Sequence, residues 1–334
     1  MRKTRLADKK EDKNKELTMN LLAPPLDDST PLPAIAPCEH IAGNEKFIKK
    51  GFKLQEQFLA ADQTSHVDLT LDLEDGAPVG KEEELRAMCA ELLHSKDNTL
   101  HQVGVRIHAL TSPHACRDLE ELITKAGNHI KYITVPKIRS ASDARWAQGL
   151  IQHYASSANL SRTIPLHLLI ETSSALSNLS TIARLSNVET FDFGLMDFVS
   201  QCGGVIPASA MRSPDQFTHP LITSTKQHIA LTALHNGIVP SHNVTVDFRN
   251  AEQVYNDART ARTLYGFLRM WSIHPEQIAP IISGILPTDD ERDEAKQILE
   301  KAARASWGPI EHNGRLHDRA SYRYYWSIIS RTKI

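Results

Sequence analysis

The sequence predicts an α/β protein, a (β/α)8 TIM barrel with a C-terminal helical extension. Short apolar runs alternate with helix-periodic stretches through most of the chain, as expected for successive βα units. Three of these runs, at residues 69–75, 166–171 and 191–197, lead directly into carboxylates. Because the carboxyl ends of parallel strands meet at one end of a barrel, these acids can gather around a single ion. The pattern is typical of an enzyme.

The first half of the chain supplies four predicted strands, at residues 34–41, 66–73, 103–108 and 130–135. Residues 45–60 have helical periodicity and separate the first two strands. Two further helices are predicted because apolar residues recur along one side at intervals of three and four. One helix has Leu85, Met88, Cys89, Leu92 and Leu93, and the next has Cys116, Leu119, Leu122 and Ile123.

The second half brings the predicted strands to eight. Ser140 and Asp143 begin a helix whose inward residues are Ala147, Leu150, Ile151 and Tyr154. Strands follow at residues 164–170 and 189–194, and two more, at 237–246 and 266–273, flank a helix at 251–264. Eight units favour a barrel over an open doubly wound sheet, and no Gly-x-Gly-x-x-Gly turn supports the open sheet.

Three regions are expected. Residues 1–33, which are charged and then rich in proline, are predicted to be a flexible leader, and residues 34–287 form the catalytic barrel. Thr288 and Glu291 form a capping box that begins the extension, residues 288–334. The extension contains Trp307, Tyr322, Tyr324, Tyr325 and Trp326, so we expect it to pack on a neighbouring subunit.

Composition limits the classes of partner. The 334 residues are 41% hydrophobic, enough for a full core, and the formal net charge of −2 gives no basic surface for nucleic acid. The four cysteines include no C-x-x-C pair, which argues against disulfides and thiolate zinc sites. No stretch approaches the roughly 20 apolar residues that span a bilayer. We expect a cytoplasmic protein with no membrane or nucleic-acid partner.

Glu171 and Asp197 are the candidate metal ligands. They follow the fifth and sixth predicted strands, and neighbouring strands lie only about 4.8 Å apart, so both carboxylates can reach one cation. With no thiolates or paired histidines nearby, Mg²⁺ is the natural occupant, and Mn²⁺ could substitute. The spacing alone equally allows Glu171 to cap its helix and Asp197 to pair with a base.

Arg106 is the candidate for an anion partner. It lies near the end of the third strand, in an otherwise apolar run where a buried guanidinium requires a counter-charge. One interpretation is a substrate carboxylate bound beside the metal. The other, equally favoured by the sequence, is a permanent salt bridge to Glu74 or Asp75.

Six short motifs together resemble the citrate lyase beta-subunit and malyl-CoA lyase group of the HpcH/HpaI aldolase superfamily, Mg²⁺-dependent carbon–carbon lyases built on a barrel. They occur in the family's order across roughly residues 40 to 320. The matching segments are L-D-L-E-D-G-A at 71–77, V-R-I-H at 105–108, V-P-K-I at 135–138, I-E-T at 170–172, F-G-L-M-D at 193–197 and I-H-P-E-Q-I at 273–278.

The resemblance implies roles for individual residues. Glu171 and Asp197 would hold Mg²⁺, Arg106 would bind the substrate carboxylate and oxyanion, and Glu74 and Asp75 would support the ligands without touching the metal. Lys137 would neutralise Glu74 or Asp75. Residues 314–318 are similar to the family's G-x-M-[IV]-D, whose aspartate acts as acid/base from a neighbouring subunit, a role that passes to Asp318 in a homotrimer or hexamer.

The implied reaction is cleavage or formation of a 3-hydroxyacyl-CoA thioester, to or from an acyl-CoA and a 2-oxo acid such as glyoxylate or oxaloacetate. Residues 37–43 lack the arginine of the family's R-S-x-L-F-V-P-G, which favours an alternative. That alternative is a class II aldolase acting on free 2-oxo-4-hydroxy acids without coenzyme A. A non-catalytic or carrier-dependent subunit of a larger lyase complex is the third hypothesis. His40 is a weak candidate for a general base, and His274 is expected to be structural.

Overall fold

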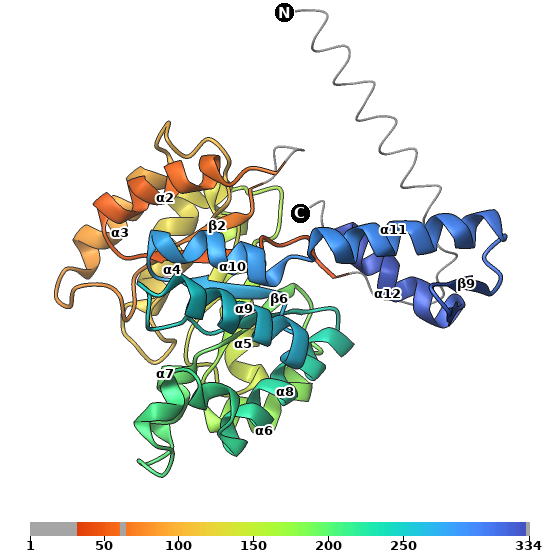
Figure 1. Ribbon diagram of the computed structural model, residues 1–334. Helices are drawn as coiled ribbons and strands as arrows, with labels where there is room; N and C mark the ends of the chain where they lie inside the picture. The colour runs from red at the N-terminus through yellow and green to blue at the C-terminus, as the bar shows by residue number, and fades with distance from the viewer. Residues whose placement is uncertain (1–31, 61–64, 332–334) are drawn as a thin grey trace, which may run out of the picture. The chain divides into compact units, whose positions relative to one another are not determined.

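The computed structural model describes residues 32–60 and 65–331 and confirms the barrel (Figure 1). Eight parallel strands pair in chain order, and the eighth closes on the first. The expected leader lies almost wholly outside the described residues and stays a prediction. The strands are β1 (Cys38–Ala42), β2 (Val67–Asp72), β3 (Val103–Arg106), β4 (Ile133–Val135), β5 (Leu166–Ile170), β6 (Val188–Phe193), β7 (Val239–His242) and β8 (Arg269–Ser272).

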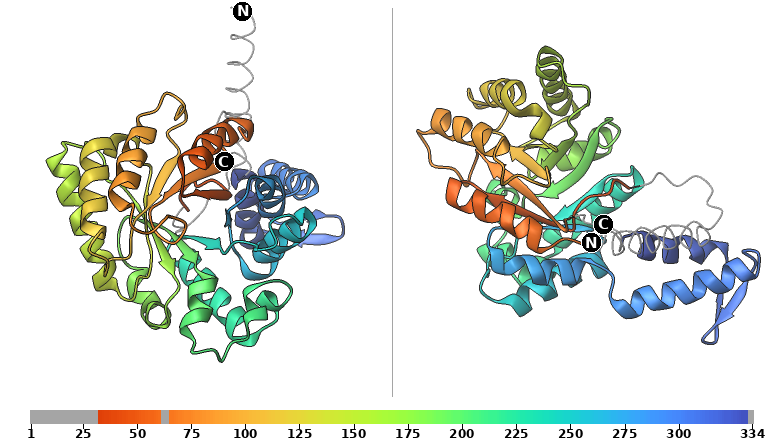
Figure 2. Two further views of the ribbon diagram at one scale, coloured as in Figure 1. Left: turned by 90° about the vertical axis from the view of Figure 1, so that its left-hand side faces the viewer. Right: turned by 90° about the horizontal axis from the view of Figure 1, so that it is seen from above.

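Helices surround the barrel strands on the outside (Figure 2). They are α2 (Glu45–Gln57), α3 (Glu82–Leu93), α4 (Ala115–Ala126), α5 (Ala141–Ser157), α6 (Ser173–Ile182), α7 (Leu195–Gln201), α8 (Pro220–His235), α9 (Ala251–Tyr265) and α10 (Ile278–Ile285). Short 3-10 turns, Gly127–His129, Ala208–Met211, Asp215–Phe217 and Pro275–Gln277, lie in the connections. The sequence analysis assigned no helix between the sixth and seventh strands, where α7 and α8 lie.

Local chemistry explains where several elements begin. The side chains of Asn44, Ser140 and Thr172 accept backbone N–H groups of the first turns of α2, α5 and α6. The first strand begins at Cys38, later than expected, because Pro37 has no N–H to donate to a neighbouring strand. The α9 helix ends at Gly266, whose φ of 79° lies in the left-handed region that favours glycine.

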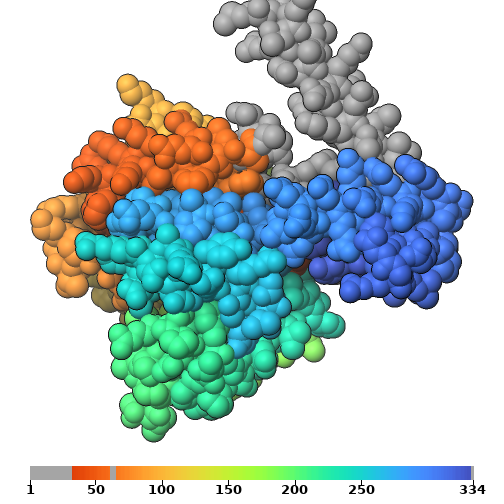
Figure 3. Space-filling model, viewed as in Figure 1, coloured from red at the N-terminus to blue at the C-terminus, as the bar shows by residue number. Residues whose placement is uncertain are grey.

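The main core lies between the strands and the helical layer, and a smaller cluster covers β1. That cluster joins Leu54 of α2, Val254 of α9 and Ile281 of α10 to Cys38 and Met270 on the strands. Figure 3 shows this layer from outside, with α10 between α2 and α9. Burying the apolar side of each helix in this way stabilises the barrel by roughly 25 cal/mol for each Å² removed from water.

The inside of the barrel is ionic at its amino-terminal half. Arg269 is fully buried and binds Glu39 at 2.9 and 3.1 Å, Asp68 at 2.5 Å and the Tyr132 hydroxyl at 3.3 Å. The Tyr132 ring has space because residue 104 is glycine, where a Cβ would lie 2.0 Å from the ring. A typical barrel fills this volume with branched apolar side chains, so here hydrogen bonds and ion pairs replace part of the apolar packing.

The described residues after 285 form a second compact unit. It contains α11 (Asp289–Arg304), a hairpin of β9 (Ile310–His312) and β10 (Arg315–His317), and α12 (Arg319–Ser330). Thr288 and Glu291 form the expected capping box at the start of α11. Its own small core contains Ile298, Leu299 and Tyr322. None of the helices in the described part of the chain combines the length and hydropathy that a bilayer crossing requires.

Candidate active site

Glu171 and Asp197 lie at the carboxyl ends of neighbouring strands. Glu171 follows β5 directly, and Asp197 is in the first turn of α7, just after β6. Glu171 is only 2% exposed, and its Oε1 accepts the backbone N–H of Lys137 at 2.6 Å. Its Oε2 lies against Gly194, where a Cβ would be 2.2 Å away. The side chain is therefore held in place from both sides.

Neither of the two carboxylates forms a salt bridge with a described residue, although the charges of Lys137 and Arg106 lie near Asp197. Burial, and then the nearby Asp197 charge, raise the pKa of Glu171 to about 8. Burial also raises the pKa of Asp197, which makes no hydrogen bond or ion pair with any described residue. Paired carboxylates that disfavour each other's charge are suited to a divalent cation with oxygen ligands. The donor set therefore fits Mg²⁺ or Mn²⁺.

The two alternatives drawn from the sequence are not what the structure contains. Thr172 caps α6, accepting the Ala175 N–H at 3.0 Å, so Glu171 is free of that function. Asp197 has no basic side chain paired with it in the described ranges 32–60 and 65–331. The metal-ligand assignment of Glu171 and Asp197 stays a prediction that this arrangement favours.

Arg106 is held by a carboxylate that the sequence analysis did not name. Its Nε and Nη2 donate to the two oxygens of Asp72 at 2.7 and 2.6 Å, and its Nη1 lies 3.4 Å from Glu74. Burial alone would lower the pKa of Arg106, but Asp72 and then Glu74 raise it above the ordinary value. The guanidinium also lies 5.8 Å from the centre of the Trp271 ring. The permanent salt bridge exists and includes Glu74, one of the two expected partners, but the shorter contacts are made by Asp72, which was not expected.

Lys137 connects the acidic loop after β2 to Glu171. Its side chain donates to Glu74 and to Asp75, the latter at 3.3 Å, while its backbone N–H holds Glu171. Its φ of 54° is unusual for a residue with a side chain and lets the two ends of Lys137 serve different partners. Burial opposes the charge of Lys137, but the hydrogen bond to Glu74 outweighs it and raises the pKa. A protonated lysine suits charge neutralisation rather than Schiff-base chemistry.

His40 and His274 are not part of this group. His40 faces outward from β1, bonds the Ser272 hydroxyl at 3.1 Å, and has its pKa lowered to about 4, chiefly by burial. It lines a cavity of about 110 Å³ to which neither Glu171 nor Asp197 contributes. His274 caps a 3-10 turn by accepting the Glu276 N–H at 3.3 Å, as expected of a structural histidine. Asp318 lies in the second compact unit, where it caps α12.

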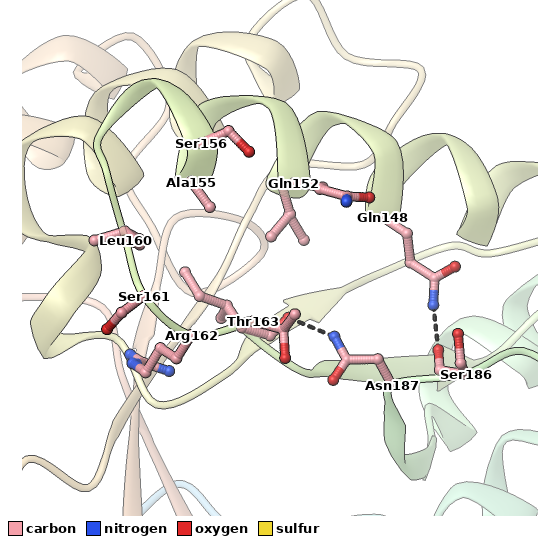
Figure 4. Close-up of a pocket in the computed structure, with 12 residues that line it drawn as sticks. Gln148, Gln152, Ala155, Ser156, Leu160, Ser161, Arg162, Thr163, Ser186 and Asn187 are labelled. Carbon is pink, nitrogen blue, oxygen red and sulfur yellow. Dashed lines mark hydrogen bonds between the residues drawn. The ribbon is translucent and has the colours of Figure 1, made fainter.

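Two other features do not coincide with the predicted site. The ligand atoms of Glu39, His167 and Asp192 lie within 4.8 Å of one another inside the barrel, but Glu39 is already neutralised by Arg269. A cavity of about 350 Å³ lies beside α5 and the amino-terminal ends of β5 and β6 (Figure 4). Its lining includes Gln148 and Asn187 and no predicted site residue. This cavity is at the end of the barrel opposite Glu171.

Sequence reasoning missed Asp72 and Trp271. Alternate residues of a strand point to the same side. Asp72 is two residues before Glu74 and Trp271 is two residues after Arg269, so this alternation would have placed both side chains inside the barrel. Glu171 and Asp197 were found because each ends an apolar run of the sequence, whereas Asp72 lies within such a run.

A closed parallel barrel with acidic residues gathered at the carboxyl ends of its strands defines the class of (β/α)8 proteins with a candidate metal site. The chain belongs to the HpcH/HpaI aldolase/citrate lyase family, whose model matches residues 56–275. It is 25% identical over 280 residues to the L-malyl-CoA/beta-methylmalyl-CoA lyase of Cereibacter sphaeroides, covering 80% of this chain and 87% of that one. It is 26% identical to mitochondrial citramalyl-CoA lyase of Mus musculus, in a match that covers 69% of this chain and 67% of that one.

Solved structures share the fold. A citrate lyase from Burkholderia xenovorans superposes with a TM-score of 0.83 at 42% identity, covering 90% of this chain and 93% of that one. A CitE protein from Mycobacterium tuberculosis, solved with magnesium, acetoacetate and coenzyme A, superposes with a TM-score of 0.68 at 21% identity, covering 90% and 99%. The resemblance inferred from the six motifs is confirmed.

Proposed function

We propose that this protein is a Mg²⁺-dependent carbon–carbon lyase that cleaves or forms a 3-hydroxyacyl-CoA thioester, to or from an acyl-CoA and a 2-oxo acid such as glyoxylate or oxaloacetate. The observation that carries the proposal is that Glu171 and Asp197 lie close together at the barrel mouth, where burial raises the pKa of both carboxyls and neither forms a salt bridge with a described residue. The similarity to malyl-CoA and citramalyl-CoA lyases supports the substrate class.

Each residue at the mouth has a distinct role in this proposal. Glu171 and Asp197 would hold Mg²⁺, which supplies Lewis-acid polarisation of the oxo-acid oxygens. Arg106, fixed by Asp72, presents its remaining N–H groups to the substrate carboxylate and to oxygen charge that develops as the carbon–carbon bond breaks. Lys137 keeps the loop carboxylates Glu74 and Asp75 charge-neutralised beside the ligands.

The second part of the proposal concerns the C-terminal extension. Asp318 would protonate the thioester enolate in the cleavage direction, from the extension of a neighbouring subunit in a homotrimer or hexamer. Tyr324 and Leu316 in the extension are 58% and 74% exposed, which suits packing against another subunit.

The test measures turnover of malyl- and citramalyl-CoA with and without Mg²⁺, in the wild type and in the Glu171→Gln and Asp197→Asn variants. Both variants should lose Mg²⁺-dependent turnover and Mg²⁺ binding while remaining folded. Glu83→Gln, which alters an exposed pair with Arg117, is the matched control and should keep full activity. Full turnover in either ligand variant would remove the metal assignment.

The free-acid aldolase is the second candidate, because residues 37–43 contain no arginine. Calorimetric titration of the Mg²⁺-loaded protein with acetyl-CoA, propionyl-CoA and coenzyme A, and separately with glyoxylate, oxaloacetate and pyruvate, distinguishes the two. Binding of a thioester beside an oxo acid supports the CoA-ester lyase. Binding of oxo acids alone supports the aldolase.

A further inference from the structure

Three histidines converge at the end of the barrel opposite Glu171. His94 follows α3, His101 precedes β3, and His129 ends the 3-10 turn before β4. The Nδ1 atoms of His101 and His129 lie 3.4 Å apart. The His94 ring centre is 4.6 Å from that of His129, and the His101 ring centre is 5.3 Å from it. Two connections, α3–β3 and α4–β4, therefore bring three imidazoles to one place on an accessible surface.

The separation of the two Nδ1 atoms matches a metal geometry. Zinc–imidazole bonds of about 2.0–2.1 Å at a tetrahedral angle place two ligand nitrogens roughly 3.3 Å apart. Without a metal, one of the two Nδ1 atoms must carry a proton and donate it to the other. A bound cation would replace that proton and leave both lone pairs directed at the ion.

His94 has the tautomer that a third ligand needs. Its Nε2 lies 2.7 Å from the Lys125 carbonyl oxygen, which can only accept, so Nε2 carries the hydrogen and Nδ1 keeps its lone pair. Metal-bound histidines commonly donate their other ring N–H to a backbone carbonyl in this way. Nδ1 is therefore the atom through which His94 would bind a metal.

The surroundings of His129 favour its neutral, metal-binding form. Burial, followed by the neighbouring His94 and His101, lowers the pKa of His129. His101 is held at a φ of 53°, an uncommon conformation for a residue with a side chain, and this backbone directs its ring toward His129. The proposed magnesium site and the mechanism use none of the three residues.

We propose that His94, His101 and His129 form a binding site for a borderline transition-metal ion of the Zn²⁺ class, separate from the carboxylate site. Imidazole nitrogens suit Zn²⁺, Co²⁺ and Ni²⁺ and are poor ligands for Mg²⁺. A bound ion would join the α3–β3 and α4–β4 connections, with water completing its coordination. The inference does not depend on the proposed lyase activity.

The experiment titrates the full-length protein with Co²⁺ and Zn²⁺ in the presence of saturating Mg²⁺, which occupies the carboxylate site. Co²⁺ should give tetrahedral d–d absorption without a thiolate charge-transfer band, which separates histidine ligands from the free cysteines. Zn²⁺ should displace the Co²⁺ and raise the thermal midpoint of the protein.

Variants then locate the site. His101→Gln and His129→Gln should each weaken Zn²⁺ binding by about tenfold or more, and His94→Gln by a smaller factor. His153→Gln, on the exposed side of α5, is the matched control and should bind as the wild type does. Circular dichroism without metal checks that each variant is folded. Unchanged Zn²⁺ affinity in both His101→Gln and His129→Gln, or a Co²⁺ spectrum with a thiolate band, would overturn the proposal.

Discussion

Replacing Asp72 by asparagine tests how the guanidinium of Arg106 is held. Oδ1 of Asp72 accepts from Arg106 Nε and from the Glu74 N–H, and Oδ2 accepts from Arg106 Nη2 and the Gly76 N–H. An asparagine NH₂ group would face two donors whichever way the amide is turned. Removing one partner of a buried ion pair lowers the free energy of unfolding by about 3–5 kcal/mol. We expect a loss in this range for Asp72→Asn, because the asparagine NH₂ group would face hydrogen-bond donors instead of accepting from them.

The assay is urea unfolding followed by circular dichroism, near pH 7, for the wild type and Asp72→Asn. Glu83→Gln is the control, because its partner Arg117 is 62% exposed and such pairs contribute less than about 1 kcal/mol. Arg106 should also lose orientation, so KM for the oxo acid should rise. A loss below about 1 kcal/mol in Asp72→Asn would refute the reasoning.

The same pair predicts a pH dependence with a definite sign. Burial opposes the charge of Asp72, but Arg106 outweighs it and holds the pKa of Asp72 below its ordinary value. A carboxyl with a depressed folded-state pKa stabilises the fold above its unfolded-state pKa, and that contribution disappears as pH falls through the folded value. The stability gap between the wild type and Asp72→Asn should therefore stay constant down to about pH 4 and shrink only below it.

Two further predictions concern Gly194 and Asp318. Gly194→Ala should weaken Mg²⁺ binding about tenfold or more, measured by calorimetry, since its Cβ would lie 2.2 Å from Glu171 Oε2; Gly149→Ala on α5, with open space around it, should leave binding intact. Asp318→Asn and Asp318→Ser should both abolish turnover while keeping the extension folded, because either residue still caps α12. Turnover retained in Asp318→Ser would show that this aspartate acts only as a cap.

The strands of the barrel could be predicted from sequence because apolar residues recur in short runs that alternate with helix-periodic stretches, even where polar side chains such as Asp68 and Thr70 of β2 point into the barrel. Residues 66–73 and 164–170 enclose β2 and β5 within one or two residues. The segment between β6 and β7 was not assigned, since α7 has only seven residues and α8 has leucines on its exposed side and polar residues, such as Thr225 and Lys226, on its buried side. Periodicity is weak in both cases.

The sequence could predict which residues lie at the site, but not which of them pair with one another. Glu171 and Asp197 follow consecutive strands, which topology alone brings together. The choice of Asp72 over Asp75 for Arg106 depends on which side chains point into the barrel and on the turn at Gly76, where a Cβ would meet Asp72 Oδ2 at 2.3 Å. Such contacts depend on the three-dimensional path of the loop after β2, which short sequence patterns do not specify.

The ion pairs inside the barrel have a consequence for folding accuracy. Arg269 on β8 meets Glu39 on β1 and Asp68 on β2, and Lys131 before β4 also binds Asp68, at 2.6 Å. Sliding any one of these strands by a single residue would turn its charged side chain toward the apolar helical layer. An apolar barrel interior tolerates such errors far more easily. The buried ion pairs therefore make the native register of the strands much more stable than registers shifted by one residue.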